Sequence, residues 1–181
     1  MAIKLSTLSI CLGLLVAVLN LFGLVNPGGF AAVARKFPRS LPVGYAFTLA
    51  GTAWFMWNVS QESLADFESL KPFLYTLFIG VGVGTCFFVQ DFLAVRGLSV
   101  LLLLLAKTMV DSQRWADSHW RLVIALWAYA LAFAGMWFTV SPWRLRDLVY
   151  WATANERRVR LGSAVPIAFG VFVAVLGFTV F

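Results

Sequence analysis

Few residues of this chain have the chemistry to hold a metal ion, and most of them lie in one short stretch. Asp111, Asp117 and His119 fall within nine residues of one another. Two carboxylates and an imidazole are possible ligands for a divalent cation. His119 is the only histidine in the sequence, and this spacing matches no common metal motif. We therefore expect a polar loop here and no metal site.

Two further pairs of ionisable residues lie beside or within apolar runs. Asp91 and Arg96 flank a short connection, and such a pair at the end of a membrane span is one way to build an ion or proton path. A charged turn between two helices explains the same residues and is the simpler reading. Lys107 and Asp111 are four residues apart, which predicts an ion pair on one helical face.

The sequence lacks the motifs of the common catalytic sites. It contains no H-E-x-x-H, no P-loop and no C-x-x-C, and its single histidine lies outside the apolar runs, so no Ser-His-Asp set can form within the membrane. The glycine-rich segment 80–84 has no preceding strand signal, which argues against a nucleotide-binding loop. Cys11 and Cys86 lie in apolar runs and are expected to be free thiols. We expect no enzyme activity and no cofactor.

The composition is that of a membrane protein. Only 12% of the 181 residues are charged, 61% are apolar, and the mean hydropathy is +0.87. A soluble domain has about 25% charged and about 45–50% apolar residues, so lipid must solvate much of this surface. The net charge of +6 comes from basic residues between apolar runs. Anionic lipid headgroups explain such residues, and we expect no nucleic-acid partner.

Six apolar runs predict six transmembrane helices in an all-α protein. The first run has 21 residues, more than the roughly 7–15 of a signal-peptide core, so we expect a retained helix. The fourth is short for a span of about 20 residues, but its Lys107 can extend to the interface. The expected spans are residues 5–25, 43–59, 72–89, 97–110, 122–140 and 161–181.

The distribution of basic residues favours six spans over five. With six, nine of the fourteen Lys and Arg residues share one side of the membrane. With five, the two most basic linkers would lie on opposite sides, against the positive-inside rule. We therefore expect a multi-pass protein of the plasma (inner) membrane, with both termini outside and loops one, three and five in the cytoplasm.

The two basic linkers are predicted to begin with short amphipathic helices at the membrane interface. Asn26-Pro27 opens the first and Ser141-Pro142 opens the second, and Asn or Ser suits an N-cap while proline suits the first turn. Apolar residues recur at helical spacing in both linkers, which leaves the basic residues for lipid phosphates. The residues expected to contact headgroups are Arg35, Lys36, Arg39, Arg144, Arg146, Arg157, Arg158 and Arg160.

Small residues at a spacing of four predict where helices approach closely. Gly80 and Gly84 form a GxxxG pattern in the third span, and Ala128 and Ala132 repeat this spacing in the fifth. Small residues allow close backbone contact between helices in lipid. Asn20 in the first span and Gln90 at the end of the third can form hydrogen bonds between helices.

The two basic linkers share an order of features that suggests a repeat of the hairpins 5–59 and 122–181. Each has a span ending in valine, a proline, arginines and a glycine near the next span. The alternative is that any cytoplasmic hairpin favours these residues. Through Pro142, Arg158 and Gly162, the last hairpin resembles a family of small bacterial inner-membrane proteins with two helices. This resemblance covers under a quarter of the chain and implies no activity.

Two functions remain open from the sequence. The first is a non-catalytic membrane protein, a structural or accessory subunit of a larger complex with other membrane-protein subunits. The second is a small transporter or channel, because repeated hairpins are a common transporter plan. The ionisable residues lie near the ends of the spans rather than at their centres, which favours the first. Binding of a lipid or quinone between the helices is a third, weaker possibility.

Overall fold

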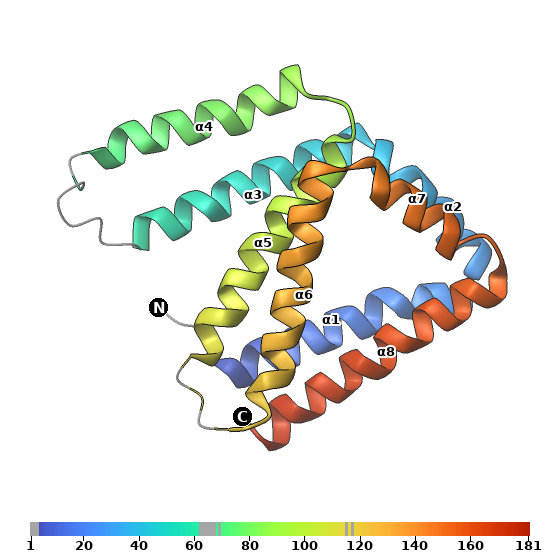
Figure 1. The fold of residues 1–181 in the computed structure, drawn as a ribbon. Coiled ribbons are helices and arrows are strands. Elements are labelled where there is room, and N and C mark those ends of the chain that lie inside the picture. Colours follow the sequence, from blue (N-terminus) through green and yellow to red (C-terminus); the bar gives the residue numbers. More distant parts are fainter. Residues whose placement is uncertain (1–3, 62–67, 69, 115, 117) are drawn as a thin grey trace.

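A computed structural model describes residues 4–61, 68, 70–114, 116 and 118–181. Within these ranges the chain is helical and has no strands (Figure 1). The helices are α1 (Leu5–Val25), α2 (Pro27–Lys36), α3 (Leu41–Gln61), α4 (Lys71–Phe88), α5 (Leu93–Gln113), α6 (Arg121–Val140), α7 (Trp143–Ala152) and α8 (Glu156–Thr179), and a 3-10 turn, η1 (Phe37–Arg39), connects α2 to α3.

Five of the described helices are long and apolar enough to cross a membrane. They are α1, α4, α5, α6 and α8. Helix α3 has 21 residues and no charged residue, but it is not among the five, because Tyr, Trp, Gly and Asn lower its hydropathy. The protein is thus all-helical with several membrane-spanning candidates.

The observed helices extend beyond several of the predicted spans. Helix α5 covers Leu93–Gln113 rather than 97–110, and so it is long enough to span without help from a snorkelling side chain. The prediction was too short because it stopped at charged residues, which this helix accommodates near its ends. Helix α8 covers Glu156–Thr179 rather than 161–181, because the predicted span began only after the basic residues that in fact form the start of this helix.

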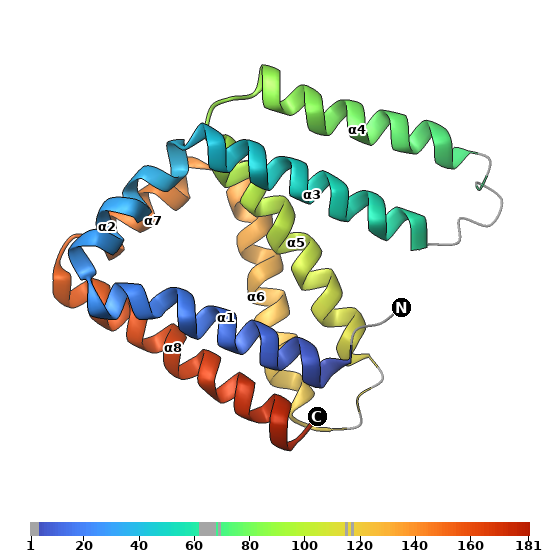
Figure 2. The ribbon, with the colours of Figure 1, turned by 180° about the vertical axis from the view of Figure 1, so that it is seen from behind.

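The long helices form an open arrangement in which α1 and α8, α5 and α6, and α3 and α4 are antiparallel pairs, while α3 and α5 run in the same direction (Figures 1 and 2). Helix α1 packs along α8, and α5 packs against both α6 and α3. Helix α4 packs mainly on α3 and lies at the edge of the molecule, away from α1 and α8. The short helices α2 and α7 lie side by side at one end.

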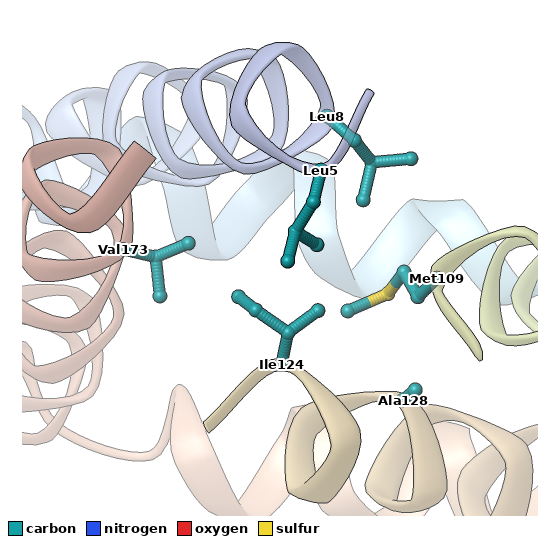
Figure 3. Close-up of a cluster of buried hydrophobic side chains, with 6 residues drawn as sticks. All are labelled: Leu5, Leu8, Met109, Ile124, Ala128 and Val173. Atoms are coloured by element: carbon teal, nitrogen blue, oxygen red, sulfur yellow. The ribbon is translucent and has the colours of Figure 1, made fainter. Parts of the chain in front are cut away.

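A buried cluster joins the α1–α8 pair to the α5–α6 pair at the opposite end from α2 and α7. Figure 3 shows Leu5 and Leu8 of α1 facing Met109 of α5, Ile124 of α6 and Val173 of α8. Trp127 of α6 and Phe169 of α8 extend the cluster through an edge-to-face contact with ring centroids 5.1 Å apart. This cluster therefore ties the two helix pairs together at this end of the molecule.

Both basic linkers form helices of ten residues, but only one has the predicted cap. The Asn26 side chain accepts a hydrogen bond of 2.9 Å from the Gly29 amide at the start of α2, as predicted. The predicted Ser141 cap was wrong, because Pro142 occupies the N-cap position of α7 and no side chain caps this helix. Each linker thus joins two long helices through a short one, while a duplication of the two hairpins stays a prediction.

Candidate functional site

The two basic linkers, which are far apart in the sequence, meet through Arg35. Its Nε donates a hydrogen bond of 2.8 Å to Thr153 Oγ1, and its Nη2 donates one of 2.6 Å to the Thr153 carbonyl. The guanidinium also lies 5.4 Å from the centroid of the Tyr150 ring. Thr153 Oγ1 in turn donates to the Val149 carbonyl at 2.7 Å. This network fixes α2 against the end of α7.

A basic cavity of about 270 Å³ lies at this contact. Arg35, Arg39 and Arg146 line it, with Pro38 and Tyr150. Arg146 forms an ion pair with Asp147 at 2.8 Å, so three guanidinium groups face this region with one neighbouring carboxylate. Guanidinium groups bind phosphate and carboxylate through paired hydrogen bonds. The chemistry of this basic cavity is therefore that of an anion site.

The remaining predicted headgroup residues surround this cavity without lining it. Lys36 ends α2, Arg144 lies in the first turn of α7, and Arg157 and Arg160 lie in the first turns of α8; all four are exposed. Arg158 is also exposed, and its guanidinium lies 5.4 Å from the centroid of a Trp151 ring. These residues gather at the end of the molecule that carries α2 and α7 (Figure 1). Their contact with headgroups stays a prediction.

The predicted pair of Asp91 and Arg96 does not form a salt bridge. Arg96 Nε donates a long hydrogen bond of 3.4 Å to the backbone carbonyl of Asp91 instead. Between them, Phe92 has a φ of 53°, the only positive φ of a described non-glycine residue. This left-handed turn reverses the chain between α4 and α5, and it leaves Asp91 and Arg39 lining a second cavity of about 420 Å³.

The possible metal ligands are not brought together. The predicted ion pair of Lys107 and Asp111 is confirmed at 2.9 Å, and Arg114 lies 3.7 Å from the same carboxylate. His119 is in the connection to α6, while Asp117 lies outside the described residues. No group of three His, Cys, Asp or Glu side chains able to hold a metal occurs among the residues that the structure describes.

The predicted packing residues lie in two different environments. Ala128 is fully buried in the cluster of Figure 3, and Ala132 is partly buried on the same helix. Gly80 and Gly84 lie away from α3, and a Cβ on Gly80 would have no heavy atom within 4 Å. It is Gly82 whose Cβ would meet the Thr52 side chain of α3. Packing at Gly80 and Gly84 stays a prediction that requires another molecule.

Sequence reasoning missed the closest helix contact, which is between α1 and α8. A Cβ on Gly170 would lie 2.5 Å from the Gly13 carbonyl oxygen and 3.1 Å from the Ala17 amide nitrogen. Ser9, Gly13 and Ala17 follow one another at intervals of four, and this small-residue spacing was the available signal. Asn20 on the same helix was predicted to bond to another helix, but its amide donates to the Val16 carbonyl of α1 at 2.8 Å.

Comparison of the chain with family models, curated proteins and solved structures finds no match. The function must therefore be argued from the chain's own residues.

Proposed function

We propose that this chain is a non-catalytic integral membrane protein that serves as a structural or accessory subunit of a larger membrane complex. Most of its described ionisable side chains lie near helix ends or in the linkers, and several of them pair with each other or with backbone groups. This arrangement supports anchoring and docking better than transport through the spans, which commonly uses ionisable groups near the midplane.

The main observation behind this proposal is the outer face of α4. Thr76, Leu77, Gly80 and Gly84 line a shallow groove of about 490 Å³ on this helix, which packs within the chain mainly on α3. The Gly80 position is open, so a partner helix can approach the backbone of α4 closely. Two helices in lipid associate through such small-residue faces. The occupant we propose is a transmembrane helix of another subunit.

Six spans and a cytoplasmic position for the two basic linkers complete the proposal. Helix α3 contains 21 residues and would be about 31 Å long at 1.5 Å per residue, which matches a hydrocarbon core of about 30 Å. It packs between α4 and α5, which are both spanning candidates. Helices α2 and α7 then lie at the inner face of the plasma membrane, where their arginines meet anionic headgroups.

Photocrosslinking in native membranes tests the partner helix directly. A benzophenone side chain at Leu77, in the α4 groove, should capture a partner protein, whereas the same group at Leu126 should capture none. Leu126 is the matched control because it is 71% exposed on α6. Gly80→Ile should abolish co-purification of the partner in mild detergent. Gly162→Ile is its control, since a Cβ there also meets no atom within 4 Å.

Two outcomes would count against this proposal. The first is a monodisperse monomer from mild extraction, with no crosslink from Leu77. The second is solute flux across liposomes that contain only this chain and that is lost on replacing Asp91 or Asn20, which would favour the transporter or channel.

A further inference from the structure

We infer that a cleft between α3, α4 and α5 binds the hydrocarbon chain of a single-chain amphiphile whose anionic head lies at Arg96. This amphiphile cleft shares Val81 and Thr85 with the groove on the outer face of α4 and shares no lining residue with the basic cavity of α2 and α7. Its head site at Arg96 lies outside that groove, so the inference does not depend on the proposed partner helix.

The cleft forms because α3 approaches each of its two neighbours at a small residue. On the α5 side, a Cβ on Gly97 would lie 2.8 Å from the Phe47 Cβ and from the Thr48 amide nitrogen, so the two backbones are close. On the α4 side, a Cβ on Gly82 would collide with Thr52. Helix α3 thus forms the floor of the cleft, and α4 and α5 form its walls.

The volume and lining suit one hydrocarbon chain. The cleft has a volume of about 440 Å³, within the roughly 300–1,000 Å³ typical of ligand pockets. Its walls are mostly apolar and include Phe55, Phe78, Val100 and Leu103. Because α4 and α5 are both membrane-spanning candidates, a lipid-soluble ligand can enter it from the bilayer.

A basic side chain lies toward each end of the cleft, and the two differ in how many hydrogen bonds they make within the chain. Arg96 and Lys107 both line it, and eleven residues of helix separate them by about 16 Å. Lys107 Nζ is bonded to Asp111 at 2.9 Å and to Asn58 at 3.3 Å. Arg96 has, among the described residues, only its long Nε bond to the Asp91 carbonyl.

The free terminal nitrogens of Arg96 therefore point to an anionic head at this end. Arg96 lies in the first turn of α5, near the end of a span, where a guanidinium binds a carboxylate or phosphate through charged hydrogen bonds. Arg146 lies 5.9 Å from the centroid of the Phe92 ring in the adjoining turn, but its charge is offset by the ion pair with Asp147. Arg96 is therefore the cation available to the head. Asp91 is close to Arg96 in the sequence, but among the described residues no salt bridge joins its carboxylate to Arg96, which bonds to the Asp91 carbonyl instead.

An unpaired hydroxyl at the same end of the cleft also supports a polar ligand head there. Thr48 lines the cleft, and its Oγ1 is buried without a hydrogen-bond partner among the described residues. The neighbouring hydroxyls are satisfied, since Thr52 donates to the Thr48 carbonyl at 2.9 Å and Thr85 to the Val81 carbonyl at 2.7 Å. Thr48 lies against Gly97, next to Arg96 on α5, where its hydroxyl can bond to a ligand head group.

Native mass spectrometry of the full chain in detergent tests this inference with four probes of equal chain length. Oleate and oleoyl lysophosphatidate carry an anionic head, whereas oleoyl lysophosphatidylcholine and oleyl alcohol have no net charge. We expect one oleate or lysophosphatidate per chain, bound at least about tenfold more tightly than the other two, as a charged hydrogen bond predicts. The better of the two anions identifies the head as carboxylate or phosphate.

Variants separate the head site from the chain site. Arg96→Gln should reduce the affinity for both anions to that for the uncharged probes, and Val100→Trp should abolish binding of all four by filling the cleft. Arg160→Gln and Val175→Trp are the controls and should bind as the unmodified chain does, because Arg160 and Val175 are exposed on α8. Equal affinity for all four probes, or an unchanged Arg96→Gln variant, would overturn the inference.

Discussion

At the scale of single residues, glycines decide which helix surfaces can meet. Gly13 and Gly170 face each other across α1 and α8, where each occupies the space that a Cβ on the other would need. Gly162, on the same helix as Gly170, has no heavy atom within 4 Å of its Cβ position. Gly162 and Gly170 both lie inside α8, so the effect of a substitution on helix propensity is comparable at the two positions and only their surroundings differ.

We predict that Gly170→Ala lowers the free energy of unfolding by roughly 1–3 kcal/mol, because the added methyl group forces α1 and α8 apart. Gly162→Ala should raise it by up to about 1 kcal/mol, since alanine favours the helix and meets no neighbour. Thermal or denaturant unfolding in detergent, followed by tryptophan fluorescence, measures both. Equal effects of the two substitutions would show that α1 and α8 do not pack at Gly170.

Two buried serines offer a second matched comparison. Ser9 on α1 and Ser99 on α5 are both fully buried, but Ser99 donates to the Val95 carbonyl at 2.8 Å while Ser9 Oγ has no partner among the described residues. We predict that Ser9→Ala stabilises the fold by about 1 kcal/mol, because it removes an unpaired buried hydroxyl. Ser99→Ala should destabilise the fold by about 0.5–1 kcal/mol, the net contribution of one hydrogen bond. Destabilisation by Ser9→Ala in the same unfolding assay would mean that its hydroxyl has a partner.

The sequence could predict that small residues matter in this chain but not which of them are buried. Gly80 and Gly84 have the spacing of a packing motif, yet within this chain α4 uses Gly82, which lies on the other side of the helix. Which glycine of α4 is buried depends on the side of α4 that faces α3, and only the three-dimensional arrangement determines that side. The same limit hid the α1–α8 contact, whose partners are more than 150 residues apart in the sequence.

At the scale of helices, the apolar runs of the sequence predicted where the long helices lie, but ending each predicted span at a charged residue placed some helix ends wrongly. The first run matches α1 at both ends, because Lys4 and Asn26-Pro27 interrupt it clearly. The run 97–110 was too short because Arg96 and Asp111 were treated as its limits, although both lie inside α5, where Asp111 forms an ion pair of 2.9 Å with Lys107. Charges separated by four residues can pair on one helix face, so they need not end a helix.

The contact between the two linker helices gives a prediction at this scale. Arg35 donates two hydrogen bonds to Thr153, so Arg35→Gln should weaken the packing of α2 on α7 and speed amide hydrogen exchange in both helices. Lys36→Gln is the control, because Lys36 is exposed one residue away. In a double-mutant cycle with Thr153→Val, we expect a coupling energy of about 1 kcal/mol. Additive effects would mean that the two linkers are independent.

At the scale of the whole molecule, the linker helices and a buried cluster that joins four long helices lie at opposite ends. Helices α2 and α7 lie at one end, and the cluster of Leu5, Met109 and Ile124 lies near the other (Figures 1 and 3). If α3 crosses the membrane, both linkers lie on one side of it. If α3 does not cross, the chain has five spans and the linkers lie on opposite sides. The position of α3 therefore determines whether Arg35 and Thr153 can meet in a membrane at all.

Labelling of single cysteines distinguishes these two topologies. In a variant with Cys11 and Cys86 replaced by alanine, we predict that cysteine at Gly28 or Asn155 is protected from an impermeant maleimide on intact cells, because the proposed topology places both linkers in the cytoplasm. Cysteine at His119 should be labelled from outside. All three positions are exposed on the protein, so protection reflects the membrane rather than burial. Labelling of only one of the two linker positions would show that α3 does not cross, and labelling of both with protection at His119 would invert the orientation.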